Sequence, residues 1–171
     1  MTDERLDNSK SAGTVCVSTD TARGSLATGH AGAIEFPIGG PDGRGGKTPG
    51  PNPYDLLNAS LAACTAMTIR RYAQRMHYPL THVDVAVSFH HGCEGATDNF
   101  ERNISLEGQI DPQQRAELLE IAAGCPVGRA LGLHARIHTS SDEDLTASTP
   151  APAANYEADI EALSIPNIDP D

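Results

Sequence analysis

The chain has 171 residues, enough for one domain or for one domain with a tail. Its net charge of −11 argues against nucleic acid or an anionic membrane as the main partner. Only 39% of the residues are hydrophobic and none is Trp, so we expect further burial through an oligomer interface. No stretch approaches the roughly 18 apolar residues of a membrane span and the charged N-terminus does not resemble a signal peptide, so we expect a cytoplasmic protein whose cysteines are free, catalytic or metal-bound.

The N-terminal part of the chain predicts a small sheet followed by a long loop. Residues 14–19 alternate between polar and apolar, and residues 25–30 and 33–36 read as two further short strands. Together they predict an antiparallel meander. Residues 39–53 contain six Gly and four Pro and fit no regular element, so we expect a loop there.

A long helix follows this loop. Asn52 can cap it, and Pro53 suits the first helical position. Asp55 falls in the first turn, where an acid can accept the backbone N–H of the cap residue. The helix should end near His77, just before a proline. Apolar residues occupy more than one face of this helix, so we expect the helix to lie at the centre of the fold or of a dimer.

Two strands, two helices and a final strand complete the pattern, at residues 82–89, 100–108, 111–123, 126–131 and 135–139. Asp111 repeats the capping pattern, and Gly124 ends the helix that Asp111 opens. Cys125 and Pro126 then read as the cap and the first residue of the short second helix. The order βββ–α–ββ–α–α–β predicts an α+β fold.

The C-terminal residues have a different composition. Residues 140–171 include eight acids and no Lys or Arg, so they carry −8 of the net charge of −11. Four Pro also fall there, which predicts an acidic, poorly ordered tail. We therefore expect a flexible N-terminus at residues 1–12, a folded domain at residues 13–139, and this tail.

Two of the four cysteines, Cys64 and Cys125, have settings suited to redox chemistry. The thiolate is the nucleophile, and a helix N-terminus would stabilise it at Cys125. Cys64 lies in mid-helix, where Arg70 and Arg71 have the wrong spacing to help, so a useful arginine must arrive by tertiary contact. If the two side chains meet, one thiolate can attack a peroxide and the other can resolve the product. The alternative is that both are structural cysteines packed among Ala and Leu.

Two runs of sequence resemble a known family. They are PNPYDLLNASLAACTAMTIRRYA and QIDPQQRAELLEIAAGCPVGRAL, with a strand pair between them. The proline-led helix carrying Ala-Ala-Cys and the later Cys-Pro-Val resemble the OsmC/Ohr family of osmotically inducible proteins C and organic hydroperoxide resistance proteins, in its OsmC-like branch. The resemblance covers roughly residues 14–139. It implies an intertwined α+β homodimer with long central helices and active sites at the dimer interface.

The resemblance also implies an activity and the residues that perform it. The activity is a cofactor-free and metal-free thiol peroxidase acting on organic hydroperoxides. Cys64 matches the peroxidatic cysteine, which becomes a sulfenic acid, and Cys125 matches the resolving cysteine, which forms a disulfide with it. A dithiol reductant, lipoyl-type or thioredoxin-like, then resets the pair. Arg23 falls where the family's activating arginine is expected. We expect the apolar part of the substrate to contact Tyr54, Leu57 and Leu61.

The chain departs from the family pattern at two positions. The activating glutamate of the hydroperoxide-resistance branch follows the proline, where this chain has Tyr54. The acid, Asp55, comes one place later and about 180° around the helix from Cys64, so helix capping is its alternative role. Gly128 stands where the OsmC-like branch usually carries His. A second hypothesis is therefore an OsmC-like redox-responsive or small-ligand-binding stress protein with little turnover, and a third is an interaction module that uses the acidic tail.

Two other patterns predict no site. His90, His91 and Cys93 form the densest group of possible metal ligands, while His134 and His138 lie about 13 Å apart on a predicted strand. We expect no metal in either place. The Gly-Gly-Lys-Thr within residues 39–53 lacks the upstream glycine and the strand-to-helix context of a phosphate-binding loop.

Overall fold

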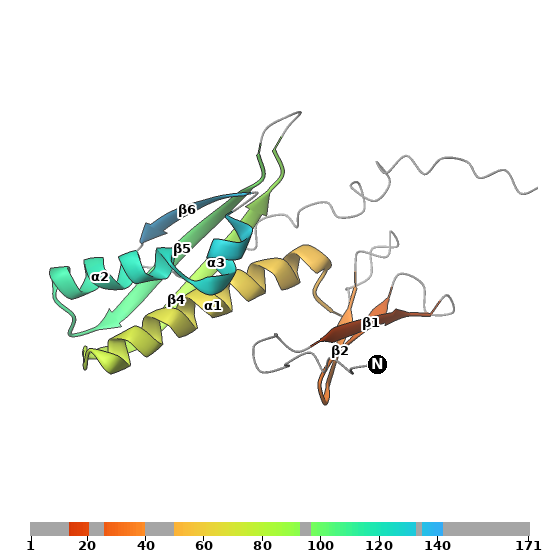
Figure 1. Ribbon diagram of the computed structural model, residues 1–171, viewed down its shortest axis with the longest axis horizontal. Helices are drawn as coiled ribbons and strands as arrows, with labels where there is room; N and C mark the ends of the chain where they lie inside the picture. Colours follow the sequence, from red (N-terminus) through yellow and green to blue (C-terminus); the bar gives the residue numbers. More distant parts are fainter. Residues whose placement is uncertain (1–13, 21–25, 40–49, 93–96, 133–134, 142–171) are drawn as a thin grey trace, which may run out of the picture. The chain divides into compact units, whose positions relative to one another are not determined.

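The computed structural model describes residues 14–20, 26–39, 50–92, 97–132 and 135–141. Arg23, Cys93, His134, and residues 142–171 of the predicted tail lie outside the described residues. The chain divides into two compact units, Met1–Pro53 and Tyr54–Asp171. The predicted order of elements, βββ–α–ββ–α–α–β, is confirmed (Figure 1).

The first unit contains the predicted antiparallel meander. Its strands are β1 (Val15–Thr19), β2 (Ala27–Ala31) and β3 (Ile34–Ile38), paired in the order β1-β2-β3. Gly32 turns the chain between β2 and β3 with φ +60°, a conformation that glycine adopts without strain. Large apolar side chains of this sheet remain exposed, among them Val15, Val17 and Ile34.

The second unit combines three helices with a three-stranded sheet. Its elements are α1 (Pro53–Arg75), β4 (Leu80–His90), β5 (Asn99–Gly108), α2 (Pro112–Ala123), α3 (Pro126–Leu131) and β6 (Arg136–Ser141). β5 lies in the middle, antiparallel to β4 and parallel to β6. The structure confirms an α+β fold, and among the described residues no helix is long and apolar enough to cross a membrane.

One hydrophobic core joins α1 and α2 to the sheet. Its buried members are Ile69 and Ala73 of α1, Ile104 and Leu106 of β5, and Leu118 and Ala122 of α2. Ile104 and Leu106 are alternate residues of a strand and share one face, so both helices pack on that face. Within this chain α1 buries a stripe at intervals of four residues, which includes Leu61 and Ile69, while Met67 on the same helix is 71% exposed.

The helix ends follow the local signals in the sequence. Asp111 forms a complete capping box with Gln114, and Gly124 caps the C-terminus of α2. Cys125 is the N-cap of α3, as expected. After the end of α1, His77 adopts a left-handed φ of 54°, and the next residue, Tyr78, donates its N–H to the carbonyl of Ala73 at 2.9 Å.

Candidate active site

The two cysteines that the sequence singles out meet at the first turn of α3. Cys64 lies on α1 and is partly buried, whereas Cys125 is 0% exposed. The backbone N–H of Val127 donates to Cys64 Sγ at 3.5 Å, and the N–H of Gly128 donates to Cys125 Sγ at 3.3 Å. Both thiols are free and belong to one apolar cluster. Two nucleophilic sulfurs therefore lie against consecutive backbone donors, where an anion is stabilised.

The buried thiol has two more polar neighbours. Thr65, the residue after Cys64, places its Oγ1 3.4 Å from Cys125 Sγ. Arg102 of β5, which is 2% exposed, brings Nη1 to 3.7 Å from the same sulfur. From the sequence, we expected an arginine to reach Cys64 by tertiary contact. The structure instead places Arg102 beside Cys125, and among the described residues no arginine donates to Cys64.

The apolar side chains expected at the site gather around these thiols. Leu61 is buried in the same cluster as Cys125, and Tyr54, Leu57 and Cys64 pack against that cluster. Its two other buried members, Phe89 and Phe100, come from β4 and β5. These side chains form an apolar surround that could hold an alkyl or aryl group.

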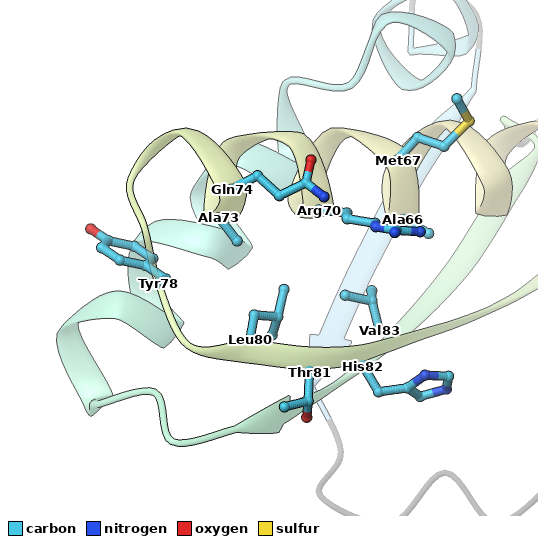
Figure 2. A pocket seen from close by; sticks show the side chains of 10 residues that line it. All are labelled: Ala66, Met67, Arg70, Ala73, Gln74, Tyr78, Leu80, Thr81, His82 and Val83. Atoms are coloured by element: carbon cyan, nitrogen blue, oxygen red, sulfur yellow. The ribbon is translucent and has the colours of Figure 1, made fainter.

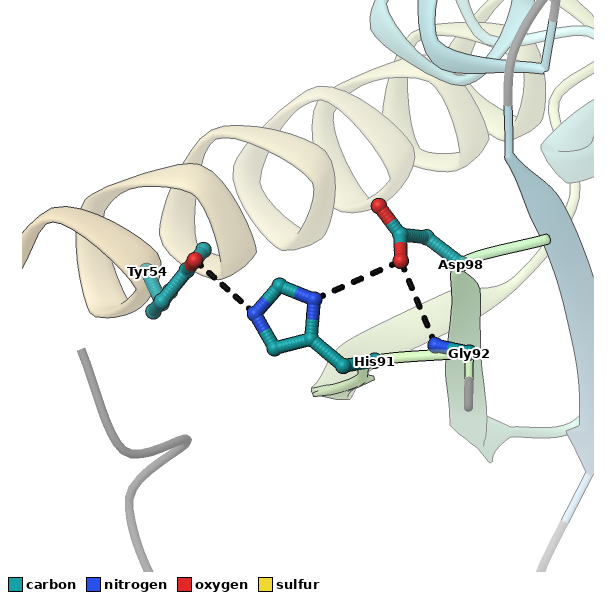
Figure 3. A network of polar contacts seen from close by, with 4 residues as sticks. All are labelled: Tyr54, His91, Gly92 and Asp98. Atoms are coloured by element: carbon teal, nitrogen blue, oxygen red, sulfur yellow. Dashed lines mark hydrogen bonds and ion pairs between the residues drawn. The ribbon is translucent and has the colours of Figure 1, made fainter. Parts of the chain in front are cut away.

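Tyr54 is held in place by an aromatic and polar network (Figure 3). Its ring stacks on Phe89 with centroids 4.8 Å apart, and its hydroxyl lies 2.9 Å from His91 Nε2. His91 Nδ1 lies 3.4 Å from Asp98 Oδ1, which also accepts the N–H of Gly92 at 3.3 Å. With the proton on Nδ1 facing Asp98, His91 Nε2 accepts the proton of Tyr54. The network therefore ties the start of α1 to the adjoining ends of β4 and β5.

The remaining predicted residues are less informative about chemistry. Asp55 is exposed in the first turn of α1, about 13 Å along the helix axis from Cys64, a position that suits its alternative role at the helix start. Arg23 lies outside the described residues, so its role stays a prediction. Within the described ranges no three potential metal ligands cluster, and His91 is instead bonded to Tyr54 and Asp98.

Thr65, Phe89 and Arg102 were not predicted as site residues from the sequence. A signal for Arg102 was present, because it alternates with Phe100 and Ile104 along β5 and so had to share their inward face. Thr65 gave no comparable signal, since its contact with Cys125 depends on how α1 packs against α3.

The structure also contains a separate cavity of about 450 Å³ between α1 and β4 (Figure 2). Its lining residues are Ala66, Met67, Arg70, Ala73, Gln74, Tyr78, Leu80, Thr81, His82 and Val83. Leu80 and Val83 both point toward α1, and His82 points away, because the pairing of β4 with β5 shifts register between Leu80 and His82. Neither Cys64 nor Cys125 lines this cavity, so it is distinct from the thiol site.

Solved structures with the same fold support the architecture. An OsmC-like protein from Mycoplasma pneumoniae superposes with a TM-score of 0.67 at 14% identity, over 78% of this chain and 97% of the other. An organic hydroperoxide resistance protein OsmC from Legionella pneumophila gives 0.59 at 21% identity, over 78% and 99%. The organic hydroperoxide resistance protein OhrB of Bacillus subtilis gives 0.57 at 21% identity, over 75% and 98%. At these identities the likeness shows the fold alone.

The sequence itself identifies the family. A search of curated proteins finds no significant match to this chain. The family model described as OsmC-like protein matches residues 44–140, more than half of the chain. This range includes Cys64, Cys125 and both of the family-like runs in full. The chain therefore belongs to the OsmC-like protein family.

Proposed function

We propose that this chain is a thiol-dependent peroxidase that reduces organic hydroperoxides through Cys64 and Cys125. The observation that carries the proposal is the placement of both sulfurs on consecutive backbone N–H groups of α3, within one apolar cluster. Two similar structures are named as organic hydroperoxide resistance proteins, which supports the same chemistry here.

The order of events follows from exposure. Cys64 is partly buried but reachable, whereas Cys125 is fully buried, so the peroxide meets Cys64 first. The Cys64 thiolate attacks the distal peroxide oxygen, the O–O bond breaks, and the alkoxide leaves as the alcohol after taking a proton. The Cys125 thiolate then attacks the sulfenic sulfur, and hydroxide leaves as water after taking a proton. The product is an intramolecular disulfide, and two electrons have passed to the peroxide.

The substrate class follows from the groups around Cys64. Tyr54 and Leu57 are partly exposed and offer apolar contact, and the buried side chains of Leu61 and Phe89 lie behind them. Burying the alkyl or aryl part of a peroxide there contributes about 25 cal/mol per Å² of apolar area. Hydrogen peroxide has no such part, so an organic hydroperoxide should react faster.

The proposal includes a homodimer and a dithiol reductant. Val17 and Ile34 of the first unit and Met67 of α1 are exposed apolar side chains, and a second copy of the chain would cover such surface. Light scattering should give twice the chain mass, and Met67→Glu should shift the protein toward monomer. A lipoyl-type or thioredoxin-like dithiol should reduce the disulfide by exchange.

A second candidate function is a redox-responsive or ligand-binding protein with little turnover. The observation that favours it is the complete burial of Cys125 beside Gly128, at the position where the branch usually carries His. Under this hypothesis the thiols pack or sense oxidants and do not cycle.

Stopped-flow oxidation of the reduced protein by cumene hydroperoxide and by hydrogen peroxide separates the two candidates. The peroxidase should form a Cys64–Cys125 disulfide, seen by mass spectrometry, and should form it faster with the organic peroxide. Oxidation no faster than that of a free thiol would exclude the peroxidase and leave the second candidate.

Cysteine variants assign the roles. Cys64→Ser should abolish turnover, and Cys125→Ser should allow one oxidation to a sulfenic acid and then stall. Cys16→Ser is the matched control, because Cys16 is a free, exposed cysteine on β1, and it should leave turnover unchanged. Equal and small effects of all three changes would mean that the cysteines only pack.

A further inference from the structure

Arg102 is a buried cation without a carboxylate partner. It is 2% exposed on the inward face of β5, and no Asp or Glu within the described ranges lies at ion-pairing distance from it. Its neutral acceptors are Thr65 Oγ1 and Ala122 O, each 3.0 Å from Nη1, and Thr139 Oγ1, 3.2 Å from Nε and 2.8 Å from Nη2. A buried charge that has hydrogen bonds but no opposite charge is costly, so a counter-ion should be nearby.

The group that can supply the negative charge is Cys125. Its sulfur lies 3.7 Å from Arg102 Nη1, accepts the Gly128 N–H at 3.3 Å, and lies 3.4 Å from the hydroxyl of Thr65. The hydroxyl of Thr65 donates its proton to Leu61 O at 2.8 Å, so the donors that face this sulfur are the Gly128 N–H and the cationic Nη1 of Arg102. A neutral thiol is a weak acceptor, whereas a thiolate is matched by these two donors. Cys64 Sγ accepts only the Val127 N–H among the described residues.

We propose that Arg102 is the buried counter-ion of the Cys125 thiolate and a positioning residue that makes the Cys64–Cys125 disulfide easy to reduce. The second half of this inference rests on the proposed function. In the reduced protein, Arg102 and the thiolate neutralise each other. When the disulfide forms, the sulfur of Cys125 becomes neutral and Arg102 keeps only neutral partners. The oxidised state is therefore disfavoured relative to the reduced state.

A dithiol attacks the Cys64–Cys125 bond, gives up two electrons and two protons, and becomes a cyclic disulfide. One proton goes to Cys64, the other goes to solvent, and Cys125 leaves as a thiolate beside Arg102. A leaving group that is stabilised as an anion leaves faster, so Arg102 should favour both the rate and the extent of reduction.

The first test measures the thiolate without requiring a disulfide. The Cys64→Ser protein should show the ultraviolet absorbance of one thiolate at neutral pH, and the added change Cys125→Ser should remove it. Arg102→Met should also remove it, while Arg102→Lys should keep most of it. The matched control is Arg115→Met, because Arg115 is a part-buried arginine of α2 that donates to Leu106 O at 3.2 Å, and it should leave the absorbance unchanged.

The second test measures the equilibrium of the disulfide. In redox buffers of glutathione or dithiothreitol, Arg102→Met should stabilise the disulfide about tenfold, which is about 30 mV for a two-electron couple. Arg102→Lys should recover most of the wild-type value, and Arg115→Met should match wild type.

The outcomes separate this inference from the proposed function. Absence of thiolate absorbance from Cys125 in the Cys64→Ser protein overturns the inference, even if Arg102→Met does not fold. If Cys125 is a thiolate that depends on Arg102, but the wild-type protein forms no Cys64–Cys125 disulfide with peroxide, the counter-ion role is supported and the peroxidase is refuted. A disulfide that is equally stable in Arg102→Met and Arg115→Met would overturn the effect on reduction while the peroxidase stands.

Discussion

Gly128→Ala tests how closely α3 packs against the buried thiol. A Cβ at Gly128 would lie 2.9 Å from Cys125 Sγ, 3.5 Å from Leu61 Cδ1 and 3.6 Å from Ile137 Cδ1. Ordinary contacts of a Cβ begin near 3.4 Å, so a Cβ at Gly128 would overlap the sulfur by about half an ångström. Both Cys125 and Leu61 are 0% exposed, so neither can move out into solvent.

The size of the effect follows from two opposing terms. Overpacking a buried site costs about 1–3 kcal/mol, whereas Ala in a helix is favoured over Gly by about 0.5–1 kcal/mol. Gly128→Ala should therefore lower the free energy of unfolding by about 0.5–2 kcal/mol. Gly124→Ala is the matched control: φ there is −86° and the nearest contact would be 3.5 Å, so it should be neutral or stabilising by up to about 1 kcal/mol.

Thermal and urea unfolding of the reduced proteins, followed by circular dichroism, measure this difference. For a chain of this size about 1 kcal/mol corresponds to about 2–4 °C in Tm, so the two alanine variants should differ by several degrees. A Cys125→Ala background removes the crowded sulfur. In that background the loss of unfolding free energy caused by Gly128→Ala should be smaller by at least about 1 kcal/mol. Equal Tm values for Gly124→Ala and Gly128→Ala, or an undiminished penalty without the sulfur, would refute the reasoning.

Three further predictions concern the second unit. Leu118→Ala should lower the free energy of unfolding by about 2–5 kcal/mol in urea unfolding, because Leu118 is fully buried between α2 and the sheet; a loss below 1 kcal/mol or so would contradict this packing. Asp111→Ala should cost about 0.5–2 kcal/mol by the same assay through loss of the capping box, while Asp111→Asn should cost less; equal costs would mean that the cap does not act through its side-chain oxygen. The hydrogen bond from the Tyr78 hydroxyl to the carboxylate of Glu117, aided by burial, raises the pKa of Tyr78 to about 12. The folded state therefore holds this proton more tightly than the unfolded state, so the stabilisation is complete below about pH 10 and is lost as the pH rises toward about 12. Spectrophotometric titration should show Glu117→Gln lowering the pKa of Tyr78, and an unchanged titration would exclude this cause.

Much of the fold could be predicted because its signals are local. The capping box of Asp111 depends on residues three positions apart, and the alternation in β4 and β5 depends on residues two apart. Cys125 could be placed at a helix start because a proline follows it. The pairing of Cys64 with Cys125 came from their family-like settings, and the structure places them in one cluster.

By itself the sequence determined the order of elements and the helix ends, and it singled out the two thiols of the candidate site. Only the tertiary structure decided what surrounds those thiols. Arg102 reaches Cys125 because β5 pairs with β6 in parallel and packs beneath α1 and α2, bringing together residues 23 and 37 positions apart. The closeness of Gly128 to the same sulfur, and the bond from His91 to Tyr54, depend on the same packing. Periodicity shows which face of a strand is buried, but the partner of a buried charge is set by strand register and helix packing, and no local pattern of residues encodes these.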